Sequence, residues 1–307
     1  PPSTSNLWVL IDYHLHLVDH GESRVFGTED VRAYARAGAA AGLTEIAITE
    51  HLYRFPDVQD AFGDWWANDP DPALVANTLR EVEDERLEQS LADYVDIVSA
   101  AASEPVDGCR VLMGLEVDLV PGRMAEVVEL LAPYDWDVLL GAVHWIGAWG
   151  YDNTSDPVQA AEWARRDSDE AWLAYTAAIE EMAASGACDV LAHLDKIKIA
   201  GVWPEHAARE CEERLVKAAT SNGLAIELNT NGLRKSISQL YPSPQLLAAM
   251  HAAGVGLTFA SDAHTADRIG GGFDEALASA RAAGYTELMR FEKRRAIAVP
   301  LPSAEAD

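Results

Sequence analysis

Seven of the nine histidines in this 307-residue chain occur in short motifs, most of which close an apolar run. They are His14, His16, His20, His51, His144, His193 and His264. Two acidic residues, Glu116 and Asp262, occupy equivalent positions in apolar runs. Imidazole nitrogen and carboxylate oxygen are good ligands for zinc, iron and manganese. The whole set is typical of a multinuclear metal site.

The first motif is DYHLH at residues 12–16, followed closely by His20. Alternate residues of a strand point the same way, so His14 and His16 could bind one ion from one face. Asp12 lies on that face too, where it could orient an imidazole without binding the ion itself. An HxH pair is common by chance, so the prediction depends on the other motifs.

Glu116 lies in the apolar run 111–117, where an unpaired carboxylate would be costly to bury. A metal ion would balance its charge, and a carboxylate can bridge two ions; a salt bridge to arginine or lysine is the alternative. The remaining motifs are TEH at 49–51, GAVH at 141–144, AHLD at 192–195 and SDAH at 261–264.

Strand-like and helical segments alternate along nearly the whole chain. We expect strands at 8–15, 44–49, 111–117, 138–143, 190–192, 225–229 and 256–260, and a final one at 287–291. Helical patterns cover 29–41, 72–102, 125–131, 169–185, 205–222 and 245–253. This alternation predicts an α/β fold whose seven or eight parallel strands close into a barrel. Active sites of such barrels collect at the C-terminal strand ends, where the motif residues lie.

No linker interrupts this pattern, so we expect residues 1–307 to form a single domain. Two long segments, 52–71 and 147–168, have no assigned elements. Long loops on a barrel are often lids or substrate walls, and a self-packed surface loop is the alternative.

The charge of the chain limits its partners. Its formal net charge of -27 argues against binding to nucleic acid or to an anionic membrane. A small phosphorylated substrate is still compatible, because metal ions can reverse the local field. The three cysteines are too few and scattered for a disulfide framework, and we see no signal peptide or transmembrane stretch. We therefore expect a cytoplasmic protein with reduced thiols; the oligomeric state is not predicted.

In order, DYHLH…HG, TEH, GLEVD, GAVH, AHLD and SDAH resemble the motifs of the PHP (polymerase and histidinol phosphatase) superfamily of metallophosphoesterases. The resemblance implies a distorted (β/α)7 barrel with a trinuclear metal site at the C-terminal strand ends. It also implies three divalent or transition metal ions, Zn, Fe or Mn. The implied ligands are, one ion at a time, His14, His16, Glu116 and Asp262; then the bridging Glu116 with His144 and His193; then His20, His51 and His264.

Within the superfamily, four segments are most similar to PHP-type L-histidinol-phosphate phosphatases: DYHLHLVDHG, GAVHWIGAWGYDN, AHLDKIK and LNTNGLRKSISQLYPS. Ala142 and Leu17 depart from the usual Ser and Thr, but neither change removes a ligand. The resemblance implies hydrolysis of L-histidinol phosphate by attack of a metal-bound hydroxide on phosphorus.

The forked donors of Arg234 suit a phosphate, so we predict that Arg234 binds this group of the substrate. Lys235 and Lys198 are weaker candidates for the same role. Asp262 is a candidate proton donor to the leaving group, as is a metal-bound water.

Three alternatives stay open. The chain could act on another small phosphate ester with the same ligand set. It could be an amidohydrolase, which also uses HxH on a barrel strand, although the usual carboxylated lysine has no clear counterpart. It could also be a non-enzymatic metal-binding or DNA-polymerase-associated module, which the complete ligand set and the acidity disfavour.

Overall fold

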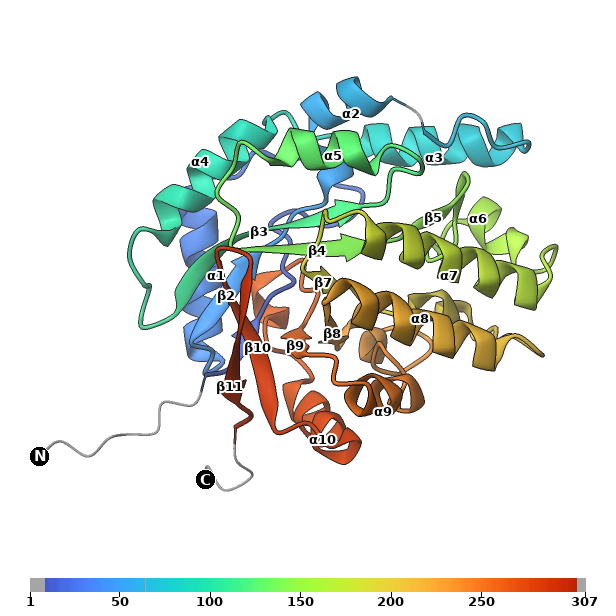
Figure 1. Ribbon diagram of the computed structural model, residues 1–307. Coiled ribbons are helices and arrows are strands. Elements are labelled where there is room, and N and C mark those ends of the chain that lie inside the picture. The colour runs from blue at the N-terminus through green and yellow to red at the C-terminus, as the bar shows by residue number, and fades with distance from the viewer. Residues whose placement is uncertain (1–8, 64, 303–307) are drawn as a thin grey trace, which may run out of the picture.

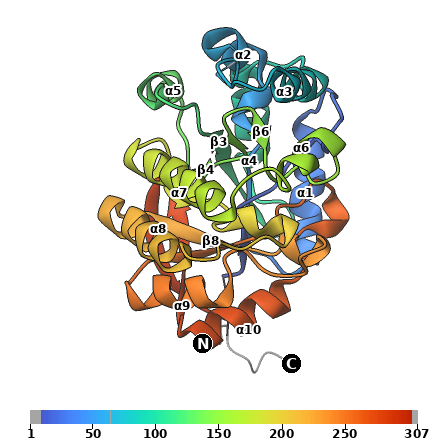
Figure 2. The same ribbon diagram turned by 90° about the vertical axis from the view of Figure 1, so that its right-hand side faces the viewer.

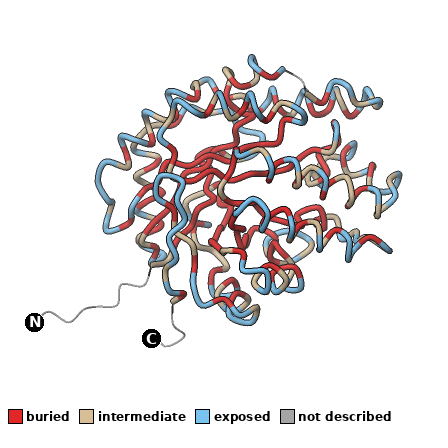
Figure 3. Tube along the Cα trace, viewed as in Figure 1, coloured by how far each residue is buried: buried red, intermediate tan, exposed pale blue. Residues whose placement is uncertain are grey.

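The computed structural model describes residues 9–63 and 65–302, and its centre is a parallel sheet (Figure 1). Seven strands follow one another in chain order across the sheet. They are β1 (Ile11–Asp12), β2 (Glu45–Ile48), β3 (Arg110–Asp118), β4 (Val138–Ala142), β7 (Val190–Leu191), β8 (Ala225–Asn229) and β9 (Leu257–Ala260). Almost every residue of these strands is buried, which explains their continuous apolar sequences (Figure 3).

The two edges of the sheet meet, so that the sheet forms a nearly closed barrel. The Tyr13 amide donates to the Phe259 carbonyl at 3.0 Å, and the His16 amide donates to the Ala263 carbonyl at 2.9 Å. β1 is shorter than the predicted strand because these contacts beyond Asp12 are isolated bonds rather than a continuous ladder. The prediction of a seven-stranded α/β barrel is confirmed.

Helices surround the barrel, as the view onto the strand ends shows (Figure 2). They are α1 (Thr28–Ala40), α4 (Leu91–Ala102), α5 (Met124–Leu131), α7 (Ser168–Ala184), α8 (Ala208–Asn222), α9 (Pro244–Ala252) and α10 (Phe273–Ala283). Helix α1 illustrates the packing: Val31, Tyr34, Ala35 and Gly38 recur every three or four residues and are its buried positions.

The single helical pattern predicted over 72–102 is two helices, α3 (Pro72–Asp84) and α4. The Ser90 hydroxyl accepts from the Asp93 amide, and the Asp93 carboxylate accepts from the Ser90 amide. This capping box begins a new helix within the pattern. The break turns α3 away from α4, and α3 therefore extends over the C-terminal ends of the strands (Figure 1).

The two long segments carry short elements that pack together. The first holds η1 (Leu52–Arg54) and α2 (Pro56–Phe62), and the second holds β6 (Trp149–Gly150) and α6 (Pro157–Glu162), with β6 paired to β5 (Trp145–Ile146). The Asp69 carboxylate of the first segment accepts from the Ala148 amide of the second at 2.9 Å. Asn77 of α3, which follows the first segment, donates to Asp156, the N-cap residue of α6, at 3.0 Å. These segments form a wall beside the strand ends.

The final predicted strand exists, but it does not join the barrel. β10 (Glu287–Glu292) pairs antiparallel with β11 (Arg295–Pro300), which the sequence analysis did not predict. The Arg290 guanidinium donates to Glu45 of β2 at 3.0 Å, and the hairpin is thereby attached to the outside of the barrel. Within the described residues, no helix is long and apolar enough to cross a membrane.

Candidate metal centre

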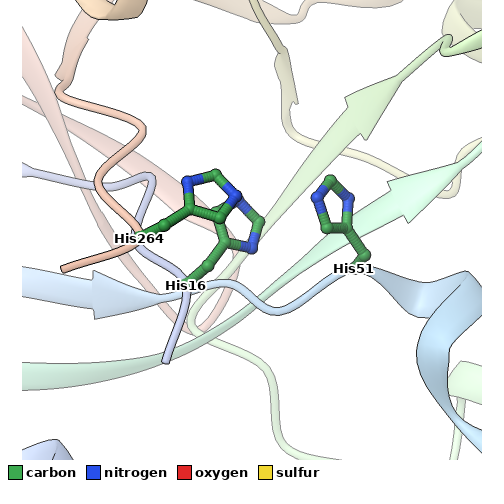
Figure 4. Close-up of side chains that lie close together, drawn as sticks. All are labelled: His16, His51 and His264. Atoms are coloured by element: carbon green, nitrogen blue, oxygen red, sulfur yellow. The ribbon is translucent and has the colours of Figure 1, made fainter. Parts of the chain in front are cut away.

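The strand ends bring eight of the nine candidate ligands into one buried cluster. The cluster contains four groups of three residues, and within each group the three ligand atoms lie within 4.8 Å of one another. The groups are His16, His51 and His264; His14, His16 and Asp262; His14, Glu116 and His193; and His51, Glu116 and His144. Figure 4 shows the first group, with the His16 and His264 rings stacked and His51 across from them.

Many ligand atoms of the cluster lack a hydrogen-bond partner among the described residues. These buried atoms are His14 Nε2, both ring nitrogens of His16 and of His51, Glu116 Oε2 and His264 Nε2. His14 Nε2 and His16 Nε2 lie 3.2 and 3.5 Å from Glu116 Oε2. Two ligand atoms of a tetrahedral zinc ion are about 3.4 Å apart, given bonds of about 2.1 Å. Unpartnered buried polar atoms at this spacing fit divalent metal ions.

Two carboxylates hold candidate ligands from the side away from the cluster. Glu227 Oε2 lies 3.0 Å from His14 Nδ1, and Asp152 Oδ2 lies 3.0 Å from His144 Nδ1. Such contacts fix the ring orientation and leave Nε2 for the ion. Neither residue was predicted from the sequence. Glu227 could have been found by the argument used for Glu116, because it is an acid in an apolar strand; Asp152 lies in a loop without such a signal.

Asp12 does not orient an imidazole, so that prediction is wrong. Its carboxylate accepts from the Ser261 amide at 2.8 Å and from the Gly270 amide at 3.0 Å. Burial raises the pKa of Asp12 to about 6, against the opposing effect of these hydrogen bonds. Asp12 therefore joins the end of β1 to the segment that follows β9.

The cluster favours neutral imidazoles at most positions. Burial lowers the pKa of His16, His51, His193 and His264. Only a neutral histidine can bind a metal ion, so this shift suits ligands. For His14 and His144, burial acts in the same direction, but neighbouring carboxylates outweigh it and raise the pKa, to about 10 for His144.

The backbone is strained at two candidate ligands. His193 has φ of 28° and Asp262 has φ of 51°, a region that residues other than glycine rarely adopt. Strain of this kind persists where the surroundings hold a residue in place, and it is found at functional sites. The sequence gives no indication of it.

His20 is the candidate ligand that falls in none of the four groups. Its side chain is 53% exposed, and its Nδ1 lies 3.2 Å from Glu85 Oε1. Its ring centroid is nevertheless only 4.5 Å from that of His264. His20 therefore lies at the rim of the cluster, and its role as a ligand stays a prediction.

The cluster opens onto a cavity of about 650 Å³. His51, Glu116, His144 and Asp262 line it from the cluster side. The first long segment contributes Tyr53, α3 and its C-cap contribute Glu81 and Glu85, and the second long segment contributes Asp152 and Asn153. The lining also includes Trp145, Lys196, Asn231 and Lys235.

The predicted phosphate-binding residues are placed differently from one another. Lys235 lines the cavity. Arg234, in η3 (Asn231–Arg234), donates to the backbone carbonyls of Ser261 and Asp262 at 2.7 and 3.3 Å. It therefore contacts the backbone of a candidate ligand.

Lys198 does not line the cavity, because its buried ammonium is held by Asp195 and by the Leu240 carbonyl, at 2.9 and 2.8 Å. Lys196, on the same short helix η2 (Lys196–Ala200), does line it and contacts Asp152 at 2.9 Å. Lys198, and not Lys196, was a predicted phosphate ligand, since the sequence alone does not show which face of η2 is turned toward the cavity.

The family model of the PHP domain matches residues 12–231. A probable histidinol-phosphatase of Deinococcus radiodurans is 32% identical over 281 residues, which are 90% of this chain and 94% of that protein. A probable histidinol-phosphatase of Schizosaccharomyces pombe is 24% identical over 69% of this chain and 72% of that protein. The crystal structure of a Lactococcus lactis histidinol phosphate phosphatase, complexed with zinc, L-histidinol and phosphate, has the same fold. It aligns with a TM-score of 0.69 and 21% identity over 94% of this chain and 98% of that chain.

Proposed function

Because the chain belongs to the PHP domain family, we propose that it is a phosphomonoesterase that hydrolyses L-histidinol phosphate to L-histidinol and phosphate. This reaction is a step of histidine biosynthesis. The observation that carries the proposal is the buried cluster of unpartnered ligand atoms beside a cavity that lysines line. The Deinococcus relative, which aligns over nearly its whole length, supports the choice of substrate.

Three divalent ions, Zn, Fe or Mn, are proposed for the cluster. His14, His16, His51 and Glu116 each belong to two of the four groups. Because the groups share these ligands, we propose fewer ions than there are groups. Bound ions would neutralise phosphate charge and lower the pKa of a bound water, which makes it available as a nucleophile. His20 would complete the ligand set from the rim of the cluster.

The lysines of the cavity are proposed to bind the substrate phosphate. Asp152 holds the Lys196 ammonium at the cavity wall, and Lys235 lines the same cavity. Arg234 is proposed mainly to hold the backbone of Asp262 in its strained conformation, and its direct contact with phosphate stays a prediction. Asp262 is proposed as a ligand, and its role as proton donor also stays a prediction.

A cytoplasmic location, a single domain over residues 1–307, and the lack of nucleic-acid and membrane binding stay predictions. The three cysteines are buried and unpaired, which supports the expectation of reduced thiols.

The experiment is phosphate release from L-histidinol phosphate and from a panel of small phosphomonoesters, with metal content measured on the same sample. We expect kcat/KM to be highest for L-histidinol phosphate, to fall below detection after chelation, and to return when Zn²⁺, Mn²⁺ or Fe²⁺ is added. Full metal loading with activity only on other esters would reject this substrate and keep the phosphoesterase. Full activity without metal would reject the metal centre.

A further inference from the structure

Helix α3 turns one face toward the cavity, and Asn77, Glu81 and the C-cap residue Glu85 follow one another along that face at intervals of four residues. A substrate that binds the cluster through its phosphate would have its remaining atoms in the same cavity. The charge of this wall therefore bears on which alcohol the site accepts.

Three of the acidic side chains that line the cavity already have a cationic neighbour. Glu85 contacts the Arg54 guanidinium at 2.7 Å, and Asp152 contacts the Lys196 ammonium at 2.9 Å. Asp156 has Arg80 within 3.8 Å and accepts a hydrogen bond from Asn77. These charges are balanced within the protein.

Glu81 is different. Its Oε1 accepts from the Asn153 side chain at 3.0 Å, while its buried Oε2 has no hydrogen-bond partner among the described residues. No lysine, arginine or histidine of the described chain lies within ion-pair distance of it. Burial, together with Asp152 and Glu85, raises the pKa of Glu81 to about 7. The carboxylate therefore lacks the cation that would stabilise its charged form.

Glu81 is linked to the ligand cluster through Asn153 and Asp152. Its partner Asn153 follows Asp152 in the chain, and Asp152 contacts the candidate ligand His144 at 3.0 Å. In L-histidinol phosphate, the α-ammonium is borne by the carbon next to the phosphorylated CH₂ group. The ammonium is therefore close to the phosphate in the substrate, so the two groups would lie in the same part of the cavity.

We infer that Glu81 binds the α-ammonium of the substrate and that Asn153 holds the Glu81 carboxylate in place for it. This inference rests on the proposed function and makes Glu81 a residue that determines substrate specificity. The imidazole of the substrate is mostly neutral at pH 7, since an unperturbed imidazole has a pKa of about 6.5, so the ammonium is the group that matches a lone carboxylate.

The test compares two substrates in the wild-type protein and in two variants. The substrates are L-histidinol phosphate and 3-(imidazol-4-yl)propyl phosphate, which lacks only the amino group. Glu81→Gln keeps the size of the side chain and its acceptor for Asn153. We expect it to raise KM for L-histidinol phosphate about 10- to 100-fold, with kcat changed less than about threefold and KM for the deaminated ester unchanged. Glu83→Gln is the matched control, because Glu83 lies on α3, is 73% exposed and does not line the cavity.

Equal effects of Glu81→Gln on the two substrates, or no effect on either, would overturn the inference while the wild-type activity kept the proposed function. Wild-type protein that is loaded with metal but hydrolyses neither ester would reject the proposed function, and the assignment of Glu81 with it. Thermal unfolding of each variant shows that a change in KM is not a loss of folded protein.

Discussion

At the scale of single residues, identical side chains near the metal centre have different tasks. Lys196 and Lys198 are two positions apart on η2, yet one lines the cavity and the other is buried against Asp195. Contact with Asp152 holds the Lys196 ammonium at the cavity wall. The position of a charge relative to the cavity therefore decides whether it can serve the substrate or only the fold.

Replacing each lysine by methionine should separate these tasks. We expect Lys196→Met to lower kcat/KM for L-histidinol phosphate about 100-fold, because a positioned charge facing the phosphate is lost. Lys198→Met should instead lower the free energy of unfolding by about 3 kcal/mol, because the Asp195 carboxylate is left buried without its cation. Steady-state kinetics on folded protein and urea denaturation measure the two effects. Equal losses of kcat/KM in both variants would contradict this division.

At the scale of elements, α3 and the segment that contains η1 are joined through one buried arginine. The fully buried Arg54 donates to Glu85 at 2.7 and 3.0 Å, to the Val18 carbonyl at 2.8 Å and to Glu50 at 3.3 Å. Tyr53 also donates to Glu85. This network holds the end of α3 against the barrel, and the cavity wall depends on it.

Arg54→Met should therefore destabilise the protein by about 3–5 kcal/mol, because two carboxylates would be left buried without their cation. Chemical denaturation of the metal-loaded protein measures the change. Arg86→Met is the control, since the Arg86 side chain is 31% exposed and pairs with an exposed Asp60. We expect the control to stay within about 1 kcal/mol of wild type. A similar loss in both variants would show that the Arg54 network is not special.

At the scale of the whole molecule, the chain carries a net charge of -27, and bound cations would offset only part of it. Mutual repulsion of surface carboxylates disfavours the compact state, and salt screens that repulsion over a Debye length of about 10 Å at 0.1 M. The acidity therefore makes stability depend on ionic strength.

We expect the Tm of the metal-loaded protein to rise by several degrees when NaCl is increased from about 0.05 to about 0.5 M, where the Debye length falls toward its value of about 3 Å at 1 M. Differential scanning calorimetry at fixed pH and metal content measures this. A Tm that is constant or falls with salt would indicate that local ion pairs, rather than net repulsion, dominate the electrostatics.

The amino-acid sequence by itself determined the barrel and nearly all of the candidate ligand set. Hydrophobic periodicity is local, and most ligands lie at or just beyond the end of a strand, which a parallel barrel must place at one face. Eight of the nine ligands meet there, and His20 stays at the rim. The division of 72–102 into two helices was missed because a capping box within an apolar pattern is a weaker signal than the pattern itself.

Only the tertiary structure decided which groups support and surround those ligands. Glu227 contacts His14 across 213 residues of sequence, and Asp152 reaches His144 from a loop, so neither pairing leaves a local pattern. Whether Lys196 or Lys198 faces the cavity depends on how η2 packs, and the isolation of Glu81 depends on where every neighbouring cation lies. Contacts of this kind are set by packing between distant segments, which the order of residues along one element does not specify.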